Sequence, residues 1–425
     1  MKNLKIDKIA ALLLLTIVGC ANDYEELTMP AKGSRKYAPY DIVWSQAADS
    51  ASQAFVERFY ADPDDASANH NGAYGVFTYS EYNKRGGNFN CYWQQAHAMG
   101  AMVEYYNRIK RSDAAEEARI RGYFKKWYDK RGNNYEGNSS WRGSTGFGND
   151  FSGDTNWITI ALLQMSEAVS ETDPDAAATY YAAAKRTWDE CVVPRFALNE
   201  YGWLPWKMTD LGANECTNGP GCIIACMLAQ DARDRGDETA AAAYLEQAYA
   251  CFDQQLHVMT ANGTLSGVPL SYTQGTCMES GRLLWKLTGN VGYLRKAIQA
   301  ARGQMMSGGM NENYNGEYVM RDEGADENNS IFHAVLFHWA TRMILDTEID
   351  SFDRSIRREL YNYVNRHASY YWTRGIRKSE IEWKDSYFGV KCYEPREAGT
   401  GGSLGAFTSA AQAIESMCMI EDVQF

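Results

Sequence analysis

The string Asn90-Cys-Tyr-Trp-Gln-Gln-Ala-His97 is the first of five short polar segments that recur along this chain of 425 residues. The other four are Asp154-Thr-Asn-Trp157, Asn214-Glu-Cys-Thr-Asn-Gly-Pro220, Tyr272-Thr-Gln-Gly-Thr276 and Asn328-Asn-Ser-Ile-Phe-His333. They begin 64, 60, 58 and 56 residues apart, and each stands at the head of an amphipathic helical pattern. This spacing is about the 40–60 residues of one helical hairpin with its loops. In an array of hairpins, alternate helices open onto the same rim, so we expect the five segments to surround one cleft.

Apolar residues at positions i, i+3, i+4 and i+7 predict twelve helices. They lie near residues 42–61, 90–110, 113–130, 153–171, 174–190, 216–235, 237–257, 275–288, 291–305, 327–347, 350–374 and 403–421. Helices in odd places are richer in charge, and those in even places carry Gly, Ala, Cys and Met, as outer and inner helices do. The pattern predicts an all-α (α/α)6 toroid, or barrel, of six helical hairpins. A curved open array is the alternative, and packing of the last helix on the first distinguishes the two.

The N-terminus has the pattern of a lipoprotein export signal. Three lysines precede an apolar run at 9–18, which is shorter than the roughly 20 residues that span a bilayer. The run ends in Ile17-Val18-Gly19-Cys20, a lipobox in which Cys20 would be lipidated; an ordinary signal peptide is the alternative. The acidic stretch 22–26 resembles the surface-export signal of Bacteroidetes lipoproteins. We expect an outer-membrane lipoprotein at the cell surface, or otherwise in the periplasm, with a signal peptide at 1–20, a flexible tether at 21–40 and one domain at 41–425.

Composition narrows the class of partner. The formal net charge is −12 and no basic cluster occurs, which argues against nucleic acid and anionic lipid as partners. Twelve Trp and 28 Tyr favour a surface that stacks on sugar rings. The ten cysteines include no C-x-x-C pair, and Cys222 and Cys226 lie in an apolar run typical of buried thiols. We therefore predict no metal site and no cofactor, an oligo- or polysaccharide partner, and a monomer.

Taken in order, the segments resemble glycoside hydrolase family 76, the bacterial and fungal endo-α-1,6-mannanases. The first is similar to that family's N-Y-W-W-Q-A-H-A pattern, residues 214–220 to its N-x-C-x-N-G-P block, and residues 272–276 to its Y-N-Q-G-x block. Residues 326–333 resemble the acidic, aromatic head of its fifth inner helix. The resemblance covers residues 45–425. It implies an (α/α)6 barrel and hydrolysis of α-1,6-mannan or a related mannose-containing glycan.

The family's adjacent catalytic aspartates, D-D-x-x-W, are only half present. The corresponding segment reads Ser152-Gly-Asp-Thr-Asn-Trp157. Alignment on Trp157 implies that Asp154 is the acid/base and that Gly153 replaces the nucleophile. If the register slips by one residue, Asp154 takes the first place and Thr155 the second. The alternative to a catalytic role is that Asp154 is the N-cap of its helix.

Glycoside hydrolysis normally requires a second carboxyl group across the scissile bond. Asp150 is the nearest candidate in sequence, and further acidic side chains are expected near the heads of other inner helices: Asp210, Glu215, Glu279 and Asp322. Seven side chains are expected to bind the glycan: Trp93, His97, Trp203, Trp206, Asn218, Tyr272 and Gln274. Core packing is the alternative for the aromatic ones, and a structural role at a helix start is the alternative for Asn218. The resulting hypothesis is a surface glycosidase, with a catalytically inactive glycan-binding lipoprotein as the alternative.

Overall fold

The computed structural model describes residues 42–62, 75–78, 92–132, 141–266, 269–323, 329–377, 387–395 and 403–425. Cys20, the predicted signal peptide and the predicted tether lie outside these ranges, as do Asn90, Cys91 and residues 324–328. Within the described ranges, no helix is both long and apolar enough to span a membrane.

Twelve α-helices dominate the described part of the chain, and each coincides with a predicted helix. The outer ones are α2 (Trp44–Phe59), α4 (Ala114–Asp129), α6 (Pro174–Thr187), α8 (Glu238–Val258), α10 (Val291–Met306) and α12 (Ile356–Tyr370). The inner ones are α3 (Tyr92–Ile109), α5 (Ser152–Val169), α7 (Glu215–Asp234), α9 (Ser271–Thr288), α11 (Phe332–Leu345) and α13 (Leu404–Ile420).

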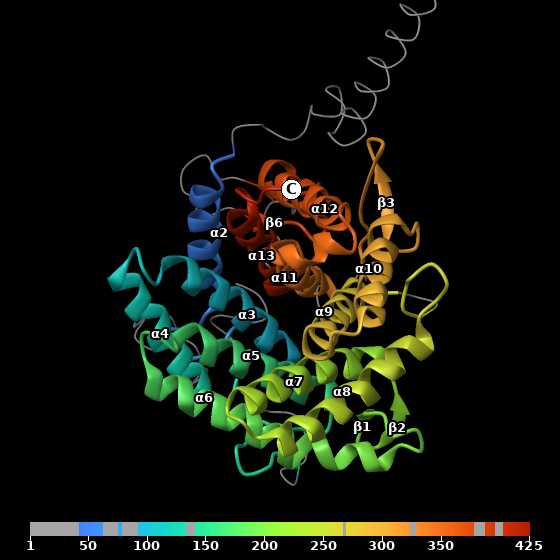
Figure 1. The fold of residues 1–425 in the computed structure, drawn as a ribbon. Helices are drawn as coiled ribbons and strands as arrows, with labels where there is room; N and C mark the ends of the chain where they lie inside the picture. Colours follow the sequence, from blue (N-terminus) through green and yellow to red (C-terminus); the bar gives the residue numbers. More distant parts are fainter. Residues whose placement is uncertain are drawn as a thin grey trace, which may run out of the picture.

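The inner helices form a closed ring inside the outer ones (Figure 1). Each inner helix packs on the next, and α13 packs both on α3 and on the first helix, α2. Polar contacts fasten this closure: Ser52 Oγ donates to Glu415 Oε1 at 2.6 Å, and Arg108 Nε lies 2.8 Å from Glu415 Oε2. The predicted (α/α)6 toroid is therefore confirmed, and the open array is excluded.

Burial separates the two rings as the sequence predicts. Inner helix α13 buries 15 of its 17 residues, whereas outer helix α4 buries five of 16. Small residues let the inner helices approach closely: a Cβ added at Gly275 on α9 would lie 3.0 Å from the Cα of Leu336 on α11. A single cluster of buried apolar residues extends from Trp44 to Ile420.

Short polar signals set the helix ends. Asp113 and Asp173 are N-caps whose carboxylates accept from the first free backbone N–H groups of α4 and α6. Pro174 occupies the first turn of α6, where its missing N–H costs nothing. Gly289 ends α9 with a φ of 71°, a conformation that glycine adopts without steric penalty.

Strands are few and short in the described residues. They form three antiparallel pairs: β1 (Pro205–Lys207) with β2 (Asp210–Ala213), β3 (Asn311–Tyr314) with β4 (Glu317–Met320), and β5 (Ile376–Arg377) with β6 (Tyr387–Phe388). Leu265 adds an isolated bridge to Met259, and α9 begins at Ser271.

Candidate functional site

Five aromatic rings at the heads of the inner helices form a closed circle of contacts, which we call the aromatic collar: Trp93, His97, Trp157, Tyr272 and Phe332. The ring centroid of His97 lies 5.7 Å from that of Trp93 and 4.6 Å from that of Trp157. The Tyr272 centroid lies 6.3 Å from Trp157 and 4.3 Å from Phe332. Phe332 closes the circle at 5.5 Å from Trp93. The heads of α3, α5, α9 and α11 therefore share one rim.

The head of α7 joins this rim. Asn156 Nδ2 on α5 donates to the backbone oxygen of Thr217 at 2.9 Å. Burial, and then the neighbouring Cys216 thiol, raises the pKa of Tyr272 in the collar. As far as the segments are described, their predicted gathering at one end of the toroid is confirmed.

Asp154 is the third residue of α5. The N-cap is Phe151, which makes no side-chain cap bond, so the interpretation of Asp154 as the N-cap is wrong. Asp154 precedes Trp157 by three residues, which places both side chains on one helix face. Burial, and then the charge of Asp154, raises the pKa of Tyr92 on α3. Asp154 therefore lies near Tyr92 at the head of α3, about one helical turn before Trp157 on α5.

Gly153 is next to Asp154 and faces the head of α7. A Cβ built there would lie 3.5 Å from Thr217 Oγ1 and 3.8 Å from the backbone oxygen of Cys216, both ordinary contacts. Thr217 Oγ1 is buried and has no hydrogen-bond partner among the described residues. Packing therefore does not require glycine at this position, and a carboxylate there would have a hydroxyl donor nearby.

Asp150 precedes the N-cap of α5, and its backbone oxygen accepts from Met208 N at 3.0 Å. Its charge acts on Arg195, a buried guanidinium that sequence reasoning missed. Arg195 donates to Ser152 Oγ at 2.9 Å and to the backbone oxygen of Asn149 at 2.7 Å. Burial lowers the pKa of Arg195, and the charge of Asp150 opposes that shift. Beside the head of α5, Asp150 thus lies near the buried guanidinium of Arg195.

Of the other acidic candidates, Glu215 lies at the rim and Glu279 does not. Glu215 is the first residue of α7, and its charge adds to the burial and Cys216 effects that raise the pKa of Tyr272. Glu279 is buried in the middle of α9, where both of its oxygens bind Arg282. The expectation that Glu279 lies near a helix head is therefore wrong.

Asp210 and Asp322 lie outside the helices. Asp210 is an exposed residue of β2, and its Oδ1 accepts from Gly212 N at 3.1 Å, as a turn residue does. Asp322 is half-buried in the segment between β4 and α11, next to Glu323.

Glu323 is a carboxylate at the head of α9 that sequence reasoning missed. Ser271, the first residue of α9, donates both its backbone N–H and its hydroxyl to Glu323, each at 2.5 Å. His333 Nε2 on α11 lies 3.5 Å from Glu323 Oε2. Burial raises the pKa of Glu323 to about 7, although the bonds from Ser271 oppose the shift. The Glu323 side chain is 1% exposed, so it connects Ser271 of α9 with His333 of α11 and does not face the cleft.

Two predicted glycan-binding amides instead anchor loops. Asn218 is fully buried; it accepts from Leu204 N and donates to Leu204 O, at 3.0 and 2.9 Å. Gln274 is equally buried, accepts from Leu265 N at 2.7 Å, and donates to the backbone oxygens of Gly263 and Ala300. The expectation that these two side chains contact glycan is wrong, because their polar atoms already serve the loop backbone.

Gln95 on α3 repeats the pattern, pairing with the backbone N–H and oxygen of Phe77 at 2.9 and 2.7 Å. Some residues of the five recurring polar segments therefore hold the rim loops in place by hydrogen-bonding to their backbone.

Trp206 and Trp203 lie on different surfaces. Trp206 is 38% exposed, meets Phe151 edge to face at 5.7 Å, and has Lys207 Nζ 4.6 Å from its ring centroid. It therefore lies at the rim beside the head of α5. Trp203 stacks on Tyr201 and donates through Nε1 to Asp253 on outer helix α8 at 3.1 Å. The structure does not bring Trp203 into the aromatic collar.

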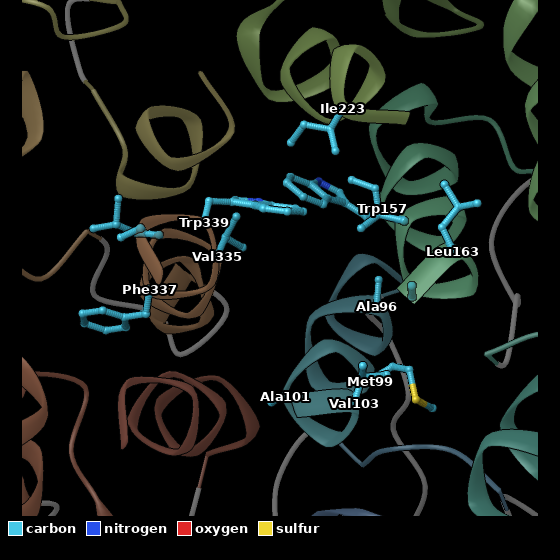
Figure 2. Packing of buried hydrophobic residues seen from close by; sticks show 14 of the residues in the cluster. Ala96, Met99, Ala101, Val103, Trp157, Leu163, Ile223, Val335, Phe337 and Trp339 are labelled. Carbon is cyan, nitrogen blue, oxygen red and sulfur yellow. The ribbon is translucent and has the colours of Figure 1, made fainter. Parts of the chain in front are cut away.

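A pocket lies beneath the collar, between α3, α5, α11 and α13. It is lined by Ala96, His97, Gly100, Trp157, Ile160, Gln164, Ala334, Val335, His338, Trp339 and Gln412. Figure 2 shows Trp157 and Trp339 pointing toward each other across it. The pocket together with its open mouth encloses about 350 Å³ of empty space.

Comparison with known proteins agrees with this architecture. The model of glycosyl hydrolase family 76 matches residues 44–424, and the chain belongs to this family. A search of curated proteins found no match.

Several solved structures share the fold. One is an inactive variant of the α-1,6-mannanase GH76A of Salegentibacter sp. HEL1_6, with two adjacent aspartates replaced by alanine, in complex with α-1,6-mannotetrose. It has a TM-score of 0.66 and 18% identity over 88% of this chain and 98% of that chain. The family 76 mannosidase Bt3792 from Bacteroides thetaiotaomicron has a TM-score of 0.61 and 14% identity over 89% and 98%. Dfg5 from Chaetomium thermophilum, in complex with glucosamine, has a TM-score of 0.65 and 13% identity over 92% and 93%.

Proposed function

We propose that this chain is a glycoside hydrolase that acts on α-1,6-mannan, with Asp154 as the general acid. The observation that carries the proposal is the placement of Asp154 one helical turn above Trp157, on the face that bears the collar. Aromatic rings suit the apolar faces of pyranoses, and a carboxyl group beside them is placed to protonate a glycosidic oxygen. The matched family and the α-1,6-mannotetrose bound by the Salegentibacter relative support this substrate class.

The second catalytic carboxyl group has to come from another residue, because position 153 is a glycine. We propose Asp150 as the base that activates water. In this step Asp154 gives its proton to the leaving oxygen as the C1–O bond breaks. Water attacks C1 from the opposite face and passes a proton to Asp150. Such a one-step displacement inverts the configuration and needs carboxyl groups about 6.5–9.5 Å apart.

A catalytically inactive glycan-binding protein is the second candidate. Gly153 favours it, because the family's nucleophile position carries no carboxylate here. Incubation of the purified chain with α-1,6-mannan, with release of reducing sugar as the readout, separates the two. Turnover that Asp154→Asn abolishes supports the hydrolase, whereas binding with no turnover by the parent supports the binding protein.

We also propose that the chain is an outer-membrane lipoprotein exposed at the cell surface and anchored through Cys20. The support is the lipobox at residues 17–20 and the acidic stretch behind it. When cells are grown with radioactive palmitate, the parent protein should become labelled and the Cys20→Ala variant should not. A labelled variant, or an unlabelled parent, would contradict the lipid anchor. Protease treatment of intact cells tests whether the protein is exposed at the surface.

A further inference from the structure

The pocket beneath the collar has apolar walls and a polar floor. Gly100, Ile160 and Ala334 are among the wall residues. His97 and Trp157 belong both to the collar and to the lining, so the pocket begins where the collar ends. Gln164 lies seven residues further along α5 than Trp157, about 10 Å deeper by helix rise.

A buried hydrogen-bond chain holds the floor in place. His338 Nε2 lies 3.0 Å from Gln164 Nε2, and His338 Nδ1 lies 2.9 Å from Glu104 Oε1. Arg342 Nη2 lies 3.2 Å from the same Glu104 oxygen. Glu104 is ionised, so it fixes a proton on His338 Nδ1. The Gln164 amide nitrogen can only donate, so His338 Nε2 accepts from it, and both ring nitrogens of His338 are occupied. The chain therefore orients the amide of Gln164, which lines the pocket.

The described residues that line the pocket include no Asp, Glu, Lys or Arg. Burial would raise the pKa of Glu104, but the hydrogen bond and charge of His338, together with Arg342, lower it to about 2. Burial, and to a lesser degree His338, lowers the pKa of His97 to about 3, so His97 is neutral near pH 7. A charged ligand group would have to lose its hydration without gaining a counter-charge, whereas a neutral hydroxyl would not.

The inner part of the pocket is small. The space that admits a water-sized group measures about 30 Å³, which is room for roughly two such groups. A pyranose ring therefore has to remain at the collar. A hydroxymethyl arm, with one apolar carbon and one hydroxyl, matches both the size and the order of apolar wall and polar floor. A ring hydroxyl projects less far and carries no apolar spacer.

We propose that this pocket receives the free hydroxymethyl arm of a hexose seated on the aromatic collar, with the Gln164 amide as its hydrogen-bond partner and with His338 and Glu104 as the residues that position this amide. The inference rests on the proposed mannan function. A 1,6-linkage consumes the C6 hydroxyl of every residue except the one at the non-reducing end. A site that requires this hydroxyl therefore recognises the chain end.

The test compares two ligands by calorimetry, in an Asp154→Asn background that prevents turnover. One is α-1,6-mannotriose, and the other is the same trisaccharide with a 6-deoxy residue at its non-reducing end. The deoxy ligand leaves the Gln164 amide without its ligand partner, so it should bind about 10-fold more weakly or worse. Gln164→Leu should weaken binding of mannotriose and remove the difference between the ligands. Glu104→Gln should reduce the difference while affinity for the deoxy ligand stays the same, an outcome that a general loss of structure would not produce.

Gln230→Leu is the matched control. Gln230 is exposed near the far end of α7 and bonds only to Asp234 among the contacts in the described chain, so this variant should keep the full discrimination. Equal affinity of the unaltered pocket for both ligands overturns the inference and leaves the mannan function standing. Failure to bind either ligand overturns both. If Gln164→Leu does not fold, the comparison of the two ligands on the intact pocket still decides.

Discussion

The imidazole of His97 on α3 and the indole of Trp157 on α5 lie 4.6 Å apart, with their planes inclined at 67°. This contact joins two neighbouring inner helices at the point where the collar meets the pocket, one turn below Asp154. Because residues 97 and 157 are 60 positions apart, the repeat of the hairpins is what brings them together. The contact between His97 and Trp157 thus marks the part of the molecule where substitutions should affect glycan binding.

Tyr272 and Trp203 should differ sharply as glycan contacts. Tyr272→Ala opens the collar between Trp157 and Phe332, and loss of one aromatic contact should weaken mannotriose binding about 2- to 10-fold. Trp203→Ala removes a ring that packs on Tyr201 and outer helix α8, so affinity should stay near the parent value. Calorimetry on both variants measures this. A larger loss for Trp203→Ala would move the binding surface to the outer wall.

Gly153→Asp should raise turnover by returning a carboxylate beside Asp154. The site accepts a Cβ, and Thr217 Oγ1 is placed to donate to the new side chain. Gly153→Ala is the matched control, since it fills the same space without a carboxylate. Initial rates on α-1,6-mannan give the comparison. Equal rates for the two variants would show that position 153 is not the nucleophile position.

Gln274→Leu should destabilise the protein because it removes three hydrogen bonds between a buried amide and the backbone of the rim loop and α10, and it takes away the acceptor of the Leu265 N–H. A buried donor left unpaired costs about 1–3 kcal/mol, and a loss of that size is expected. Urea denaturation measures the free energy of unfolding, with Gln230→Leu as the exposed control. If the two variants are equally stable, Gln274 is not the anchor that its contacts indicate.

Glu323 should make stability fall as the pH rises from about 4.5 to 7. Burial raises its folded-state pKa to about 7, so the folded state holds this proton more tightly than the unfolded chain does. The stabilisation is complete below the unfolded value and is lost as the pH rises through 7, with a slope of up to about 1.4 kcal/mol per pH unit.

Buried His97, His333 and His367, whose pKa values are lowered to about 3, 4 and 3, act in the opposite direction. The informative quantity is therefore the difference between the parent and Glu323→Gln, measured by urea denaturation at several pH values. Parallel pH profiles would mean that Glu323 carries no such proton.

Much of the architecture could be predicted because helical periodicity and caps are local signals. The helix expected at 153–171 is α5 at 152–169, and the expected Pro174 start of α6 is observed. Side-chain direction was harder to predict. Asn218 and Gln274 belong to polar segments that do reach the rim, yet their amides turn toward loop backbone, and sequence spacing does not distinguish loop from cleft. Glu323 gave no local signal, because its burial depends on Ser271, 52 residues away.

The measurement that tests the central claim most directly is hydrolysis and binding of α-1,6-mannan by the parent and Asp154→Asn. The substitution keeps the shape of the side chain and removes its proton. If Asp154 is the general acid, turnover should fall by at least about 10²-fold while affinity stays near the parent value. A parent that binds mannan without hydrolysing it, or a variant as active as the parent, would contradict the assignment.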